Sequence, residues 1–173
     1  FGRALQDPAI WWEALAAAFK GLELTGLQVL ALAIDGTSGT ILPCDADGKA
    51  SGLASMYNDV AEAAAVTAVK SVAPAETAAL GGTSPLARAM MMDVASPRIL
   101  HQADWLLGRL CGRFDVSDEN NALKSGYDPV TRRWPAWIAG TGFDVKRFPS
   151  VVPAGERVGT VLPEMARQFG LPD

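Results

Sequence analysis

The feature that most constrains the fold is a nearly unbroken apolar run over residues 27–34 (LQVLALAI), closed by a polar, glycine-rich turn over residues 35–40 (DGTSGT). Such a run, bounded by turn residues, is typical of a strand buried on both faces in the centre of an α/β sheet. Ligands of open α/β sheets bind beyond the carboxyl ends of the strands, so the turn is a candidate binding loop. Its backbone N–H groups and hydroxyls suit a polyol or a phosphate. No Gly-Lys-Ser/Thr follows it, so it is not a P-loop, and an ordinary tight hairpin turn is the alternative.

The surrounding segments predict helices and short strands. An apolar stripe of helical spacing follows Asp7 and Pro8 and predicts a helix over residues 8–20. Strands are expected over residues 40–44 and 54–57, with a hairpin-like turn over 45–49 between them. Further helices are expected over 60–80 in two pieces, over 86–92, over 98–111 and over 163–169, and residues 148–153 read as irregular. The chain therefore predicts one α/β domain whose mixed sheet contains residues 28–34 and 40–44 and is flanked by the helices over 8–20 and 98–111.

Composition excludes several functional classes. The chain has 173 residues, of which 49% are hydrophobic, and a net charge of −4, which argues against nucleic acid and against a polybasic membrane surface. No apolar stretch is long enough to predict a transmembrane helix. Two cysteines, Cys44 and Cys111, are too few for a disulfide framework or a zinc cluster and are expected to be reduced thiols. The single histidine, His101, excludes a multi-histidine metal site and is expected to be solvated or locally packed.

Other candidate residues are polar side chains at the ends of predicted elements. Asp59 follows the third strand, and Asp118 and Asn121 follow the long helix. A cap or turn role is the alternative for each of them. No Ser-His-Asp, Cys-His or metal-ligand spacing is present. A small α/β hydrolase that uses Ser38 would lack a base, because nothing brings His101 towards it.

The order of several segments resembles the N-terminal domain of the FGGY family of carbohydrate kinases. The matching segments are DPAIWWEAL (7–15), VLALAIDGTSGTILPCDADGK (29–49), MYND (56–59), SPLARAMMM (84–92), ILHQADWLLGRLCGRFDVSDENNALKSGYDPVTRRWP (99–135) and FPSVVPAGERVGTVLPEMARQFGLP (148–172). Each segment is weakly specific by itself, whereas six in this order cover essentially the whole chain. The motifs IDGTSGT and DENNALKSGYDP are most similar to those of the D-ribulokinase and xylulokinase-like branch.

The resemblance implies an actin-like, ribonuclease-H-like fold and a kinase that transfers the γ-phosphoryl group of ATP, with Mg, to a hydroxyl of a small sugar. A pentulose, D-ribulose or xylulose, is the expected substrate. The resemblance places substrate-binding residues at Thr37, Ser38, Gly39, Asp59, Asp118 and Asn121. The arginine that often follows the position of Asp59 in the family is absent here. Glu119 stands where glycerol-kinase-like members carry a tyrosine, which argues against glycerol.

The same resemblance predicts which parts of the family's structure this chain lacks. The family's first strand, with Asp-x-Gly-Thr, would precede Phe1, and the Gly-Gly-x-Asp segment with the catalytic aspartate would follow Asp173, together with the ATP-binding domain. Residues 1–173 are thus expected to be the interior of the sugar-binding domain, with no catalytic residue and no metal ligand, and to be inactive alone. We expect a cytoplasmic full-length protein that forms a homodimer, binds a small-molecule sugar and contacts neither nucleic acid nor membrane. A non-catalytic actin-fold interaction module is the alternative, and the flanking sequence would distinguish the two.

Overall fold

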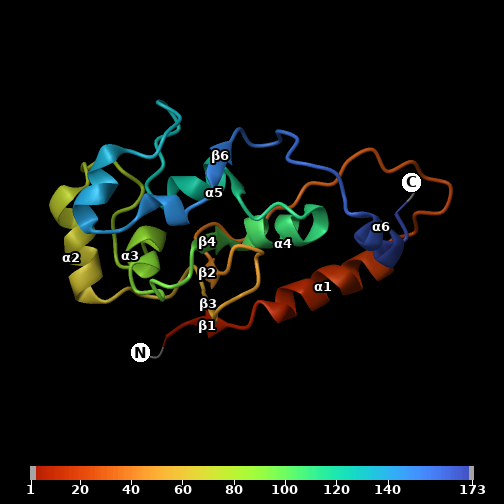
Figure 1. Cartoon of the computed structure of the whole chain (residues 1–173), viewed down its shortest axis with the longest axis horizontal. Coiled ribbons are helices and arrows are strands. Elements are labelled where there is room, and N and C mark those ends of the chain that lie inside the picture. The colour runs from red at the N-terminus through yellow and green to blue at the C-terminus, as the bar shows by residue number, and fades with distance from the viewer. Residues whose placement is uncertain (1–2, 172–173) are drawn as a thin grey trace.

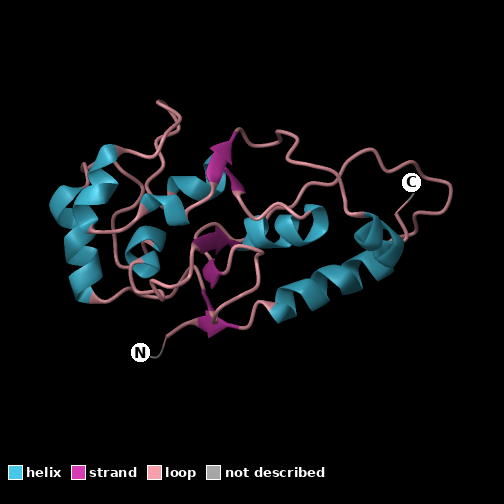
Figure 2. Ribbon diagram, viewed as in Figure 1, coloured by secondary structure: helices cyan, strands magenta, loops and turns pink. Residues whose placement is uncertain are grey.

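Helices cover both faces of a small antiparallel sheet in the computed structural model, which describes residues 3–171 (Figure 1, Figure 2). The elements in chain order are β1 (Leu5–Gln6), α1 (Ala9–Lys20), β2 (Ile41–Cys44), β3 (Ala54–Ser55), α2 (Ala63–Val72), α3 (Pro85–Ala89), β4 (Arg98–His101), α4 (Gln102–Cys111), β5 (Val116–Asp118), α5 (Glu119–Leu123), η1 (Ala136–Thr141), η2 (Val145–Arg147), β6 (Ser150–Val152) and α6 (Pro163–Phe169).

The register of the main sheet brings three chain segments to one end. The strand order is β1-β3-β2-β4, and every neighbouring pair is antiparallel. Ile41, the first residue of β2, lies opposite both Ser55, the last residue of β3, and His101, the last residue of β4. The loop before β2 and the last residues of β3 and β4 therefore meet at the same end of the sheet. A separate two-stranded parallel sheet pairs β5 with β6.

Side chains of β2 alternate between two hydrophobic clusters, as the two-residue period of a strand requires. Ile41 lies in a cluster completed by side chains of α2, α3 and η1. Leu42 lies in a second cluster, with Trp11 of α1 and Trp105 of α4. The strand is therefore buried on both faces, and this burial fixes its register against β4.

The predicted central strand over residues 27–34 is wrong. These residues have no regular structure, and the side chains of Leu27 and Leu30 are 60% and 84% exposed. Leu32 and Ile34 pack partly against the cluster where α1, α4 and α6 meet. A strand needs a neighbouring backbone for its N–H and C=O groups, and within residues 3–171 no strand pairs with this segment. The mixed sheet expected around it is instead an antiparallel sheet and a separate parallel pair.

Four other predicted segments differ from the structure. The helix expected over residues 98–111 is strand β4 for its first four residues, because each of them pairs with a residue of β2. Residues 74–80 form turns rather than a second alanine-rich helix, and the segment 148–153 contains strand β6. The helix expected over 86–92 is α3, which ends at Ala89. The helices predicted over 8–20 and 163–169 and the strand over 40–44 are confirmed.

The state of the two cysteines and the lengths of the helices bear on what the composition led us to expect. Cys44 and Cys111 are both free, and burial, with a smaller effect of the neighbouring Asp45, raises the pKa of Cys44 to about 12. None of the helices in the described part of the chain is long and apolar enough to cross a bilayer.

Candidate functional site

The candidate binding loop is a tight turn whose free donors can be counted. The amide of Thr40 donates to the carbonyl of Thr37 at 3.1 Å, and Gly39 has a φ of +87°, which such turns require at their third residue. The amide of Thr37 is already engaged, since it donates to Oε1 of Gln102 at 2.9 Å. Over the described residues, the amides of Ser38 and Gly39 and the Ser38 hydroxyl make no hydrogen bond. Ser38 is partly exposed whereas Gly39 is buried, so the amide and the hydroxyl of Ser38 are the groups that a ligand can reach.

Three elements surround this loop. A Cβ atom on Gly36 would lie 3.1 Å from the amide nitrogen of Ala103, so the loop crosses the N-terminal end of α4 at close range. A Cβ atom on Gly39 would lie 3.4 Å from Cγ of Pro85 in α3 and 3.8 Å from Cδ of Lys124, which follows α5. The loop therefore lies where α3, α4 and α5 converge at one end of the main sheet.

Arg88 of α3 is a fully buried arginine beside the loop. Its Nη2 donates to the carbonyl of Gly39, and its Nη1 donates to Oγ of Ser55 at 2.8 Å and to the carbonyls of Ser55 and Met56 at 2.9 Å each. The carbonyl of Thr83 accepts from Nε and Nη2. Burial lowers the pKa of Arg88 to about 10, so the guanidinium carries its charge at neutral pH.

Asp59 is also buried, with 2% of its surface exposed. Arg3 donates to both of its carboxylate oxygens at 2.7–3.0 Å, and Ser55 donates to Oδ2 at 2.7 Å. The amides of Ala4 and Val60 donate to Oδ1 at 3.1 Å each. Burial alone raises the pKa of Asp59, but the donors, Arg3 foremost, outweigh burial and bring the pKa to about 2. The acceptor capacity of this carboxylate is filled, so a sugar hydroxyl would have to replace one of these partners.

Ser55 joins the two predicted segments into one network. Its hydroxyl donates to Asp59 and accepts from Arg88, which in turn binds the carbonyl of Gly39. The loop over residues 37–39 and Asp59 are thus connected through two residues that the sequence analysis did not single out. A sequence signal for Arg88 was present: it is a lone charged residue within the apolar segment SPLARAMMM, and arginine is seldom fully buried unless it is paired.

Asp118 and Asn121 lie together at the start of α5. Asp118 caps this helix: its Oδ1 accepts from the amides of Asn120 at 2.7 Å and Asn121 at 3.0 Å, and its Oδ2 accepts from Nδ2 of Asn121 at 2.8 Å. Lys124, which approaches the loop, follows the other end of α5. Asp118 and Lys124 are six positions apart, which at a helical rise of 1.5 Å per residue separates them by about 9 Å along the axis. No described contact joins Asp118 or Asn121 to the loop.

His101 is locally packed in a buried Ser-His-Asp arrangement, and it ends strand β4 instead of lying on a helix face. Its Nδ1 is 2.9 Å from Oδ2 of Asp104, and its Nε2 is 3.0 Å from Oγ of Ser125. All three residues are at most 3% exposed, so no substrate reaches Ser125. Because both ring nitrogens are engaged, His101 does not serve Ser38 as a base, and the geometry gives no support to a hydrolase.

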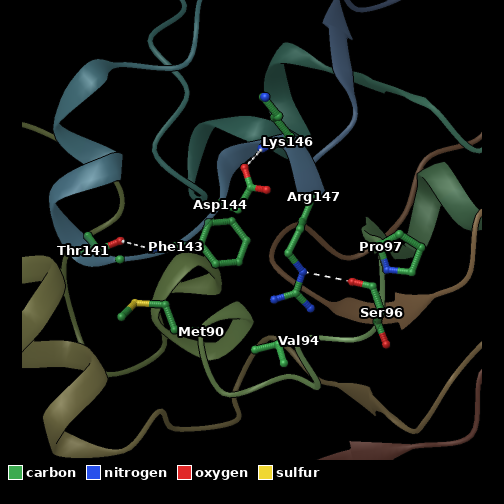
Figure 3. A pocket seen from close by; sticks show the side chains of 10 residues that line it. Met90, Val94, Ser96, Pro97, Thr141, Phe143, Asp144, Lys146 and Arg147 are labelled. Atoms are coloured by element: carbon green, nitrogen blue, oxygen red, sulfur yellow. Dashed lines mark hydrogen bonds between the residues drawn. The ribbon is translucent and has the colours of Figure 1, made fainter.

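A cavity of about 430 Å³ lies away from this network, at the opposite end of β4 (Figure 3). Arg147 stands at its centre and donates to the carbonyls of Ser96 at 3.0 Å and Asp93 at 2.6 Å. Figure 3 shows that the Lys146 ammonium and the Ser96 hydroxyl both point away from this guanidinium. Since the polar groups do not converge on one point, the cavity lacks the arrangement that fixes a small ligand.

Comparison with solved structures identifies the fold, whereas no family model matches the chain. A xylulose kinase from Rhodospirillum rubrum superposes with a TM-score of 0.81 and 21% identity, over 99% of this chain and 39% of that one. A carbohydrate kinase from Novosphingobium aromaticivorans gives a TM-score of 0.76 and 20% identity, over 99% and 39%. A gluconate kinase from Lactobacillus acidophilus gives 0.76 and 11%, over 98% and 38%.

These similarities show that the chain has the α/β fold of one part of the sugar kinases, so the predicted actin-like fold class is confirmed. The chain spans about two fifths of the length of the kinases that it matches.

Proposed function

We propose that this chain is part of an FGGY-type carbohydrate kinase that transfers the γ-phosphoryl group of ATP to a hydroxyl of a small sugar, most specifically the pentulose D-ribulose or xylulose. The observation that carries the proposal is the superposition of 99% of the chain on a xylulose kinase with a TM-score of 0.81. The order of the six sequence segments points independently to the same family.

The loop over residues 37–39 supports a neutral, polyhydroxylated substrate. The groups that it presents are the amide and the hydroxyl of the partly exposed Ser38, and they carry no formal charge. Such groups exchange hydrogen bonds with sugar hydroxyls, which both donate and accept. In this scheme the loop orients the sugar, and binding in a fixed position lowers the entropic cost of phosphoryl transfer.

We propose further that residues 1–173 correspond to the interior of the sugar-binding domain and are inactive alone, with ATP and Mg²⁺ held mainly by other parts of the kinase. Within residues 3–171 no three His, Cys, Asp or Glu side chains come together in a way that could hold a metal ion. The acceptor capacity of the buried Asp59 is filled by Arg3, Ser55 and backbone amides. The described residues therefore do not fit a Mg²⁺ site, and we assign them no step that involves the metal.

The test is a coupled ADP-release assay with ATP, Mg²⁺ and either D-ribulose, D-xylulose, glycerol or gluconate. The protein assayed is the natural full-length chain that contains these residues, with the 173-residue chain in parallel. We expect turnover with a pentulose for the long protein and none for the short one. Absence of sugar-dependent turnover in the long protein would favour the non-catalytic interaction module. Turnover by the pure 173-residue chain would refute the proposed division of the active site.

Replacing Ser38 with alanine tests the loop in the full-length kinase. Loss of one neutral hydrogen bond costs about 0.5–1.5 kcal/mol, so Ser38→Ala should raise the KM for the sugar roughly 2- to 13-fold. The KM for ATP should stay nearly unchanged, because the nucleotide is held elsewhere. Ser71→Ala is the matched control, since Ser71 is exposed on α2 and donates only to its own helix. A change in ATP affinity with unchanged sugar affinity would contradict the assignment of the loop.

A further inference from the structure

Arg88 makes an unusual set of contacts for a buried cation. Each of its three guanidinium nitrogens donates to a backbone carbonyl, and one also donates to the Ser55 hydroxyl. No carboxylate lies within ion-pair distance of it among residues 3–171. The nearest acidic partner in the network, Asp59, is reached through Ser55. Burying a charge is costly unless its hydrogen bonds are satisfied, so these carbonyls have to be held in place around the guanidinium.

Arg88 joins the paired strand β3, through the Ser55 carbonyl, to carbonyls of segments that no strand pairing fixes. The Gly39 carbonyl lies in the turn before β2, and the Met56 carbonyl lies just after β3. Gly39 lacks a side chain that could pack, and its φ of +87° is one that most residues avoid. A single planar guanidinium with donors on three nitrogens can hold these carbonyls at once, which the point charge of a lysine cannot do.

We propose that Arg88 is a positioning residue for the substrate loop: it pins the Gly39 carbonyl against the end of β3 and thereby sets the orientation of the Ser38 amide and hydroxyl. This inference rests on the proposed function, because it takes the loop over residues 37–39 as the sugar-binding element. Arg88 does not touch the sugar, since it is fully buried. Its effect reaches the substrate through the turn that Thr40 closes on Thr37.

The first experiment compares Arg88→Lys with Arg147→Lys in the full-length kinase. Arg147 is the matched control, because its guanidinium also binds two backbone carbonyls but does so at the far end of β4. Hydrogen bonds from a charged donor are worth more than neutral ones, so Arg88→Lys should raise the sugar KM by roughly tenfold or more. The KM for ATP should change less than about twofold in both variants, and Arg147→Lys should leave the sugar KM unchanged.

The second experiment does not depend on activity. Hydrogen exchange of the Thr40 amide, measured by NMR in the 173-residue chain, reports the turn directly because this amide bonds to Thr37. We expect at least about tenfold faster exchange in Arg88→Lys and a smaller acceleration in Ser55→Ala, which keeps the arginine but removes one of its acceptors. Ser55→Ala also serves if Arg88→Lys does not fold.

The outcomes separate the two proposals. If the full-length protein has no sugar-dependent turnover, the proposed function fails, and the exchange of Thr40 still decides whether Arg88 positions the turn. If a folded Arg88→Lys variant keeps both the wild-type sugar KM and the wild-type Thr40 exchange, Arg88 only stabilises the fold and the inference is overturned. Equal effects of the Arg88 and Arg147 substitutions on the sugar KM would overturn it as well.

Discussion

Acid should remove a definable part of the stability of this protein through Asp59. Folding lowers the pKa of this buried carboxyl from 3.8 to about 2. A carboxyl whose pKa is lowered by folding stabilises the folded state fully above its unfolded pKa, and this contribution is lost as the pH falls through the folded value. The difference corresponds to about 2 kcal/mol of unfolding free energy at neutral pH. We expect its loss between about pH 4 and pH 2.

Urea unfolding, followed by tryptophan fluorescence at a series of pH values, measures this contribution. The wild type is compared with Asp59→Asn, which keeps the shape of the side chain but cannot titrate. The difference in unfolding free energy between the two proteins should shrink by about 1.5 kcal/mol between pH 6 and pH 2.5. Asp115→Asn is the control: the Arg113 guanidinium lowers the pKa of Asp115 too, but solvent screens that exposed pair, and the change should be well below 1 kcal/mol. A wild-type to Asp59→Asn difference that stays constant with pH would refute the reasoning.

Three substitutions, measured by urea unfolding, test the backbone conformation of the turn and the packing at two other positions. Gly39→Ala should lower the free energy of unfolding by about 1–2 kcal/mol because Gly39 has a positive φ. Gly82→Ala is the control and should lower it less, because a Cβ there meets only ordinary contacts. Equal losses in the two variants would contradict the turn. Gly108→Ala should cost about 1–3 kcal/mol, since a Cβ would lie 2.4 Å from the ring of Phe114, and a neutral result would mean that the ring can move away. Leu30→Ser in the 173-residue chain should change stability by less than about 0.5 kcal/mol, and a larger loss would show that residues 27–34 are packed after all.

Elements marked by their own residues could be predicted from the sequence, and elements that depend on a distant partner could not. Ser84 accepts a hydrogen bond from the amide of Ala87 at the start of α3, and Gly112 and Gly170 end α4 and α6 in left-handed conformations, as their residue types indicated. In contrast, β4 and the segment 27–34 both contain apolar residues that suit either a strand or a helix. Only the presence of β2 beside one of them, and of no partner strand beside the other among residues 3–171, distinguishes them.

In the candidate site, too, locally marked residues could be predicted and residues that depend on distant contacts could not. The turn over residues 37–40 could be predicted because glycine, serine and threonine after an apolar run indicate a polar turn, whereas its role in sugar binding stays a prediction. The lone charge of Arg88 in an apolar segment indicates a buried, paired arginine, but its pairing with Ser55 spans 33 residues of chain, and no local pattern encodes that contact. The sequence left open whether His101 is solvated or locally packed, because the helix was predicted to begin before it. It is instead the last residue of β4, and the sheet buries it.

The hydrogen-bond capacity of each side chain ranks the predicted substrate residues more sharply than their positions do. A carboxylate accepts about four hydrogen bonds. Asp59 already receives at least that many from Arg3, Ser55 and two backbone amides. Asp118 receives three, two on Oδ1 and one on Oδ2, which leaves one position on Oδ2 for a ligand hydroxyl. Together with the free groups of Ser38, this makes Asp118 a better candidate for direct sugar contact than Asp59, whose filled carboxylate anchors the network behind the loop.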